Sequence, residues 1–454
     1  MAPKPLPRGA LVFSLAVGLG GFVAAGACSL DTRGTLLTSS TASNGASSPG
    51  GQGGTGNIGA GGTGTGGITS QGGTGGTGGQ GGFGGSVPGW VAGDPGADGT
   101  YTLPSWLTFS SPSPNKTVET SASTLRKGLG VNAPRARNVG GGWGLCVESA
   151  RTNNATYSES WTGGAWVVGD MTVYAAQPDP AGGTSATHFF SPASANGHYG
   201  NYLVDPQGAA ASVASAWLKG IVGSAPYATF RYIEGLPVTA TTWTRLVQRA
   251  PAIVGIAAAV ETRAFGQAAV ITGDTMTGVY GLQVEPNALY PSTFIPTTTT
   301  PVTRAAERLY INDPAALFPN GYFSVEVEVA PRYAEAELAA GAEHDLLYFA
   351  ADSRLFVRRN AGGTSTEICL SVHADEICVG PLTWAAETAL TVAADHVPGG
   401  RVLSVAGADQ GAVTQNAAAL TPLVLGATVE VLGNGLPGAQ ECADLRRLNY
   451  APVP

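Results

Sequence analysis

The clearest pattern of apolar and polar positions lies near the end of the chain. In residues 323–329, phenylalanine and valine alternate strictly with serine and glutamate. This two-residue period predicts a β-strand with one buried and one solvated face. Comparable runs, separated by turn-forming residues, follow at 345–349, 354–358, 367–372, 389–393, 401–405, 427–432 and 443–450. Residues 311–454 are therefore predicted to form an antiparallel β-sandwich.

Shorter apolar segments, rich in valine, threonine, tyrosine and tryptophan, recur earlier in the chain between turn signals. They lie at 166–168, 173–175, 213–218, 228–233, 242–247, 253–260 and 278–284. Segments of this length favour strands over helices. Residues 253–265 are rich in alanine, and we still assign a strand there. Residues 90–310 are thus predicted to hold an extended lead-in and a first antiparallel β-sandwich, which makes the chain all-β.

Residues 29–89 show no such alternation and are dominated by glycine, with serine and threonine between the glycines. A segment of this kind buries too little apolar surface to offset the entropy lost on ordering. It is predicted to be a disordered tether. At 5–6 Å × √n, about 60 residues give a root-mean-square reach of roughly 40 Å.

Residues 1–28 have the features of a targeting signal. A positively charged start precedes an apolar run at 10–27, which ends in a small-residue cleavage site followed by Cys28. The segment resembles a bacterial lipoprotein signal, in which the cysteine is acylated, with palmitate as the expected chain, and becomes the mature N-terminus. An ordinary secretory signal cleaved after Ala27 is the alternative. A transmembrane helix fits less well, because the run is only about eighteen residues long and contains many glycines.

Composition and charge agree with an exported protein. Only 12% of the residues are charged, 67 of the 454 are glycine, and the net charge is −8. These values are typical of an extracellular β-protein and not of a cytosolic enzyme. An acidic chain with 23 scattered lysines and arginines lacks the basic surface of a nucleic-acid binder. Since Ser29 follows Cys28, where aspartate would favour inner-membrane retention, we expect a lipid anchor in the outer membrane or at the cell surface.

Once the lipidated cysteine is set aside, four cysteines remain, an even number that suits an oxidising compartment. Cys369 and Cys378 flank residues 373–374, and a symmetric hairpin centred there places the two cysteines opposite each other at a non-hydrogen-bonded pair. A Cys146–Cys442 bond then follows by elimination. Zinc is the alternative, but the short Cys-x-x-Cys pairs of structural zinc sites are missing.

Several separated blocks carry a resemblance to a known module. The chain contains Gly-Leu-Cys-Val-Glu-Ser-Ala-Arg-Thr-Asn at 144–153, Tyr-Ser-Glu at 157–159, Ala-Trp-Leu-Lys-Gly at 216–220, Thr-Trp-Thr-Arg at 242–245, Tyr-Pro-Ser-Thr-Phe-Ile-Pro-Thr at 290–297 and Thr-Arg-Ala-Ala-Glu at 303–307. In this order they resemble a jelly-roll module of bacteriophage tail-fibre and minor structural proteins, itself similar to carbohydrate-binding modules. The resemblance spans residues 131–310 and implies a β-sandwich surface suited to glycans.

Residues 311–454 resemble the concanavalin A-like or laminin G-like sandwich that often follows this module. The resemblance rests on the opening strand, a Leu-Phe-Val strand and the closing segment 443–448. Two features depart from the family, because Cys146 and Cys378 are not part of its pattern and a lipoprotein signal replaces the phage context. The departures weaken any role in a virion.

The opening and closing blocks are dense in charged residues, which also suits an active loop. Because they recur as the brackets of a family, we interpret them as framework. We expect Arg151 and Arg304 to pair with Glu148, Glu285 or backbone carbonyls within the fold. Binding of acidic sugars by these arginines is the alternative.

Glycan binding needs an aromatic platform for the C–H faces of the sugar together with planar polar partners. Trp166, Trp217 and Trp243 lie within the shared blocks and are predicted to be core residues. Trp161 and Trp384 lie near turn-like sequence and are the predicted ligand-binding candidates. No cofactor is expected. The acidic turn at 94–99 is the one calcium candidate, although its Asp-Gly and Pro-Gly pairs are ordinary turn formers.

The sequence contains little that indicates catalysis. Glu326 and Glu328 share one strand face, but their alternation with valine marks the solvated face, and no third acid completes the pattern of a sandwich glycosidase. The five histidines show no metal-ligand spacing. We therefore predict a non-catalytic surface lipoprotein that binds a glycan or another surface polymer. An assembly or adhesion protein that binds other proteins is the alternative, and a polysaccharide hydrolase or lyase fits less well.

Overall fold

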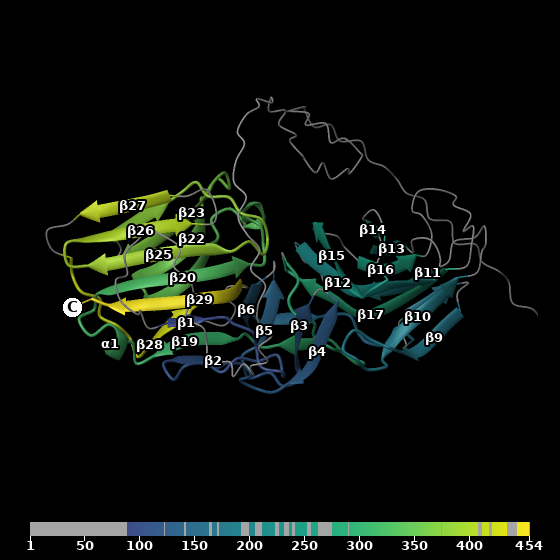
Figure 1. Ribbon diagram of the computed structural model, residues 1–454. Coiled ribbons are helices and arrows are strands. Elements are labelled where there is room, and N and C mark those ends of the chain that lie inside the picture. Colours follow the sequence, from purple (N-terminus) through teal and green to yellow (C-terminus); the bar gives the residue numbers. More distant parts are fainter. Residues whose placement is uncertain are drawn as a thin grey trace, which may run out of the picture. The chain divides into compact units, whose positions relative to one another are not determined.

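The computed structural model describes residues 89–454, except 122, 140–141, 163–165, 170–171, 192–198, 205–210, 223–226, 231–235, 238–240, 252–255, 262–274, 289, 374, 407–410, 417–419, 434–442 and 454. The predicted signal, the acylation site Cys28 and nearly all of the predicted tether lie outside these residues. The described part is an all-β fold of antiparallel sheets (Figure 1). Among its residues, no helix is long and apolar enough to cross a membrane.

Two large sheets form the sandwich that contains the C-terminal strands. The first runs in the order β27 (Gly411–Asn416), β26 (Gly400–Ala406), β25 (Leu390–Val397), β20 (Phe323–Pro331), β29 (Ala443–Pro452), β6 (Gly142–Val147) and β5 (Ala136–Val139), with β1 (Gly89–Val91) also pairing with β29. The second runs in the order β2 (Leu107–Ser110), β19 (Arg308–Asn312), β28 (Thr428–Val431), β21 (Glu343–Ala350), β22 (Ser353–Arg359), β23 (Thr366–Val372) and β24 (Asp375–Val379). Their inner faces share one hydrophobic core.

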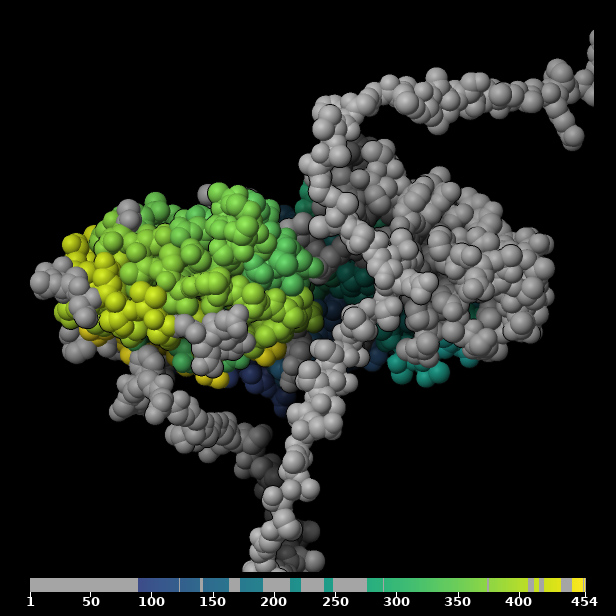
Figure 2. All heavy atoms as spheres, turned by 90° about the horizontal axis from the view of Figure 1, so that it is seen from above, coloured from purple at the N-terminus to yellow at the C-terminus, as the bar shows by residue number. Residues whose placement is uncertain are grey.

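Strand β20 shows why the alternating sequence folds in this way. Phe323, Val325 and Val327 are at most 1% exposed and face the core. Glu326 and Glu328 point the other way and form ion pairs with Arg447 of the neighbouring strand, each at 3.1 Å. The predicted strands of residues 311–454 are all present, and the side chains of this sandwich pack into a continuous surface, coloured green to yellow in Figure 2.

The module between the brackets contains two five-stranded antiparallel sheets. One has the order β15 (Thr244–Pro251), β12 (Ala211–Val222), β17 (Thr275–Pro286), β10 (Ala186–Ser191) and β9 (Thr172–Gln177). The other has the order β14 (Leu236–Pro237), β13 (Tyr227–Phe230), β16 (Ile256–Glu261), β11 (Tyr199–Val204) and β8 (Trp166–Gly169). The alanine-rich stretch is a strand, β16, as predicted.

The remaining elements are short. β3 (Lys116–Ser121) and β4 (Thr124–Leu129) form a hairpin, and β7 (Arg151–Asn153) pairs with β18 (Val302–Arg304). The helical elements of the described residues are α1 (Pro314–Leu317) and a 3-10 turn at Glu335–Glu337.

The domain boundary at residues 310 and 311 was predicted wrongly. Strands β1, β5 and β6, which the sequence assigned to the lead-in and the first sandwich, belong to the sheet of β29 and β20. Strand β2 likewise pairs with β19. The C-terminal sandwich therefore includes N-terminal strands, and the module of residues 151–304 is inserted between β6 and β19. Strand edges need partners, and local alternation does not encode which partner will cover them.

The cysteines follow one prediction and depart from the other. Cys369 and Cys378 lie directly opposite each other in the β23–β24 hairpin and form a disulfide bond, with a Cα–Cα distance of 4.1 Å. His373, at the predicted tip, adopts a left-handed backbone conformation with φ 52°. Cys146 is a buried free thiol, contrary to its predicted bond with Cys442, which lies outside the described residues.

Candidate binding site

The two tryptophans predicted to bind ligand are buried instead. Trp161 is 0% and Trp384 is 7% exposed. Their indole N–H groups donate to the carbonyls of Ser158 and Tyr333, at 3.2 and 3.0 Å. Turn-like sequence around a tryptophan therefore did not indicate exposure here. A large apolar ring whose single polar group finds an internal acceptor is more stable in the core.

Trp217 and Trp243 are core residues, as predicted, with exposed fractions of 0% and 8%. Trp217 packs against Tyr280 and Phe294, with ring centroids 6.2 and 5.6 Å away. The side chain of Trp166 lies outside the described residues. None of the described tryptophans in the shared blocks offers a platform to a ligand.

The two bracketing blocks bind each other, as the framework interpretation predicted. The amide of Glu307 donates to the carbonyl of Glu148 at 2.9 Å, and the amide of Glu148 donates to the Glu307 carboxylate at 3.1 Å. Arg304 pairs with Glu148 at 2.7 Å, and Arg151 lies 3.9 Å from Glu285. These arginines are therefore occupied within the fold.

Glu148 belongs to a larger buried network of five arginines and five carboxylates, which balance in charge. It contains Arg135, Arg137, Arg245, Arg304, Arg332, Glu119, Glu148, Glu307, Glu387 and Asp444. The network joins the β3–β4 hairpin, the inserted module and the C-terminal sandwich. Burial acts to raise the pKa of Glu148, but the surrounding arginines hold it well below its usual range.

Ligand atoms of Cys146, Glu148 and Glu307 lie within 4.8 Å of one another, a spacing that suits a metal ion. Both carboxylates, however, already accept from Arg135, at 2.7 and 2.5 Å. Burial raises the pKa of the Cys146 thiol, and so disfavours the thiolate that a metal requires. The cluster is built to hold arginines.

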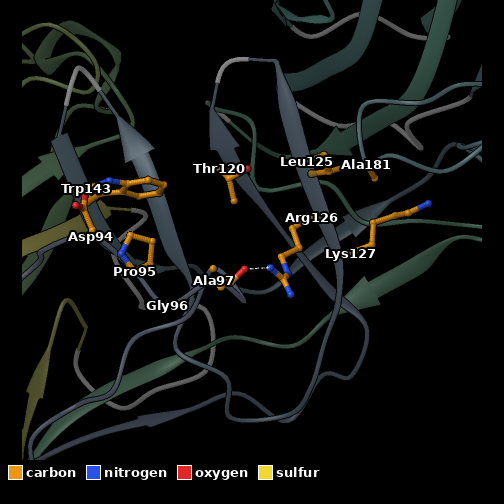
Figure 3. Close-up of a pocket in the computed structure, with 11 residues that line it drawn as sticks. Asp94, Pro95, Gly96, Ala97, Thr120, Leu125, Arg126, Lys127, Trp143 and Ala181 are labelled. Atoms are coloured by element: carbon orange, nitrogen blue, oxygen red, sulfur yellow. Dashed lines mark hydrogen bonds between the residues drawn. The ribbon is translucent and has the colours of Figure 1, made fainter. Parts of the chain in front are cut away.

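An open cleft of about 680 Å³ lies between the turn at residues 94–99, the β3–β4 hairpin and the start of β6 (Figure 3). Its lining residues are Asp94, Pro95, Gly96, Ala97, Gly99, Thr120, Leu125, Arg126, Lys127, Trp143 and Ala181. Figure 3 shows two walls. Trp143, Asp94 and Pro95 stand on one side, and Thr120, Arg126 and Lys127 stand on the other.

The position of Trp143 follows from the sheet register. β29 pairs with β6 at Leu145, Cys146 and Val147, and this ladder ends before Trp143. There β6 pairs with β5 alone, where Asn138 is the partner of Trp143. The indole is left half-buried, and its ring projects into the cleft (Figure 3).

The opposite wall is held by backbone and side-chain contacts. The amide of Leu125 donates to the carbonyl of Pro180 at 3.0 Å, which attaches β4 to the inserted module. Arg126 donates to the carbonyl of Ala97 and so links the hairpin to the turn. Lys127 pairs with Glu159 at 2.7 Å.

The acidic turn uses one of its two carboxylates internally. Asp98 accepts from the amide and the hydroxyl of Thr100, at 3.1 and 2.6 Å, and these bonds lower its pKa. Neither carboxylate of the turn belongs to a cluster with metal-ligand spacing among the described residues. Asp94 is exposed and lines the cleft.

Sequence reasoning missed Trp143, although a signal was present. The residue stands in the run Gly140-Gly141-Gly142-Trp143-Gly144, where its neighbours carry no side chains to cover the ring. The register that leaves its edge open was not visible in the sequence.

A second pocket of about 390 Å³ lies beside residues 113–116, 294–298 and 302–304. Phe294 is the one aromatic residue in its described lining, and its ring is 1% exposed. This pocket therefore lacks a face on which a sugar ring can stack, and the larger cleft is the better candidate.

No protein-family model and no curated protein matches the chain. Among solved structures it is similar to tailspike protein 2 of bacteriophage CBA120 (12% identity, TM-score 0.24, 32% of this chain and 24% of that one). It is also similar to a xylan β-1,4-xylosidase of Bacillus halodurans C-125 (12%, 0.22, 65% and 56%) and to tail fibre protein gp63.1 of an Escherichia coli phage (10%, 0.19, 67% and 40%). The chain thus spans a quarter to just over half of their lengths. At these TM-scores the similarity does not extend beyond β-rich architecture, and it assigns neither family nor activity.

Proposed function

We propose that this protein is a lipid-anchored surface protein that binds a glycan in the Trp143 cleft. The observation that carries the proposal is the half-buried indole of Trp143, which projects into an open cleft whose other wall carries Thr120 and Arg126. An aromatic face can stack against the C–H face of a sugar ring, while hydroxyl, guanidinium and carboxylate groups bind its hydroxyls.

The size and lining of the cleft suit this role. A volume of about 680 Å³ lies within the range of roughly 300–1,000 Å³ in which ligand sites fall. Polar groups line both walls, with Asp94 on the indole side and Thr120 opposite. An oligosaccharide segment entering the cleft therefore meets one stacking face and hydrogen-bonding groups from two directions.

We propose binding without turnover. Glycosidases use two carboxyl groups on either side of the scissile bond, roughly 5–9.5 Å apart. Asp94 is the one carboxylate in the described lining of the cleft. Glu326 and Glu328, the acids that the sequence brought forward, pair with Arg447 on a sandwich face away from this lining.

Replacing Trp143 with alanine is expected to weaken glycan binding by about 30-fold, because a buried aromatic anchor contributes roughly 2 kcal/mol or more to recognition. A glycan array with the purified full chain identifies the ligand, and titration calorimetry compares the variants. Tyr174→Ala, which removes an aromatic side chain that is 44% exposed but lies outside the cleft, is the control. Binding that survives Trp143→Ala unchanged contradicts the site, and release of sugar products contradicts the non-catalytic role.

The anchor rests on the sequence signal alone and has its own test. Cells expressing the protein are grown with radiolabelled palmitate, and the label is expected on the wild type and not on Cys28→Ser. Ser29→Ala, which changes the neighbouring residue, should remain labelled. An unlabelled wild-type protein would point instead to cleavage after Ala27 without acylation. With the anchor, we place the binding domains at the outer membrane or cell surface.

A further inference from the structure

We infer that the glycan bound in the Trp143 cleft is acidic and that Arg126 holds its carboxylate. This inference rests on the proposed glycan-binding function and names the class of sugar. It starts from the charged residues of the cleft and asks which of them already have partners inside the protein.

Arg126 differs from the arginines that stabilise the fold. Many arginines in the described part of the chain form ion pairs with aspartate or glutamate: Arg135, Arg137, Arg151, Arg245, Arg304, Arg308, Arg332, Arg354, Arg358, Arg359, Arg401 and Arg447. Arg126 forms no ion pair with a described residue. In a protein with only 12% charged residues, an arginine kept in a cleft without a carboxylate is available for a ligand.

The hydrogen bonds of Arg126 leave much of its guanidinium available. Nη1 donates to the carbonyl of Ala97, a neutral acceptor that orients the group. Asp98 does not take its charge. Its carboxylate accepts from Thr100, and the influence of Arg126 on the pKa of Asp98 is smaller than that of those bonds. A guanidinium oriented by one contact, with free N–H groups, matches a carboxylate through two parallel hydrogen bonds.

The other two charged groups of the cleft give it a direction. Lys127 is neutralised by Glu159, at 2.7 Å. Asp94 stands on the indole wall, across the cleft from Arg126 (Figure 3). A sugar stacked on Trp143 therefore meets an anion that accepts from its hydroxyls on one side and a cation that attracts its carboxylate on the other. A uronic acid residue, with one carboxylate on a hydroxylated ring, has this distribution of groups.

The test compares the same sugar with and without its charge. The probes are oligomers of galacturonate, glucuronate and mannuronate, each paired with its methyl ester, and binding to the full chain is measured by calorimetry at low ionic strength. We expect at least one acid to bind about tenfold more tightly than its ester. Arg126→Gln should remove that preference and leave the affinity for the ester nearly unchanged. Trp143→Ala should weaken both forms.

Two control variants separate Arg126 from general charge effects. Lys127→Gln should change the preference by less than threefold, because its charge is already compensated. Asp94→Asn should increase the affinity for the acid. If no acid binds more tightly than its ester, or if Arg126→Gln keeps the preference, the acidic inference is overturned, while binding of neutral glycans would leave the proposed function intact. If the array shows no glycan bound at all, the proposed function fails as well.

Discussion

Replacing Glu148 with glutamine is expected to lower the free energy of unfolding by about 3–5 kcal/mol, as found when one partner of a buried ion pair is removed. The Glu148 side chain is fully buried and receives N–H groups from Arg135, Arg304 and Arg332. Glutamine has nearly the same volume, so no cavity forms. The loss arises because three buried arginines are left with one carboxylate fewer.

Glu326→Gln is the matched control, since the same chemical change is made in a partly exposed pair with Arg447. Exposed pairs contribute at most about 1 kcal/mol, so this variant should lose no more than that. Urea denaturation followed by circular dichroism measures both. Equal losses in the two variants would show that the buried network does not hold the sandwich and the inserted module together.

Gly281→Ala is expected to cost about 2–5 kcal/mol. Its backbone has φ +68°, where a side chain costs about 1–2 kcal/mol. A Cβ would also lie 2.7 Å from Cε3 of Trp217, which is fully buried against Tyr280 and Phe294. Relieving that overlap requires the core to shift, at roughly 1–3 kcal/mol more.

Gly341→Ala separates these two contributions. Gly341 has φ +76°, and a Cβ there meets nothing within 4 Å. The variant should therefore lose only the conformational part, about 1–2 kcal/mol. Thermal and urea denaturation of the two variants give the difference, which we assign to Trp217. A Gly281→Ala protein as stable as the Gly341→Ala protein would contradict the close packing.

Several features could be predicted from the sequence because their causes are local. The strand β20 follows from the two-residue alternation of its own side chains, and the disulfide follows from the symmetry of one hairpin. The pairing of Arg304 with Glu148 was predicted from the charged brackets of the module. These cases depend on a few neighbouring residues or on two blocks that recur together.

Other features could not be predicted, because they depend on how distant strands meet. The alternation in 107–110 marks a strand but not its partner β19, about 200 residues later. For the same reason the exposure of tryptophans was misjudged. Trp161 and Trp384 are covered by segments that their own sequence does not specify, while Trp143 is left open by the end of a ladder with β29.

The sequence alone determined the all-β character of the described chain, the positions of most strands and the hairpin disulfide, because backbone period and turn chemistry act over a few residues. The tertiary structure alone decided that the N-terminal strands complete the C-terminal sandwich. It also brought residues 94–99, 120–127 and Trp143 together as one cleft. Those outcomes require hydrogen bonds and packing between segments far apart in the chain, which no local pattern of residues encodes.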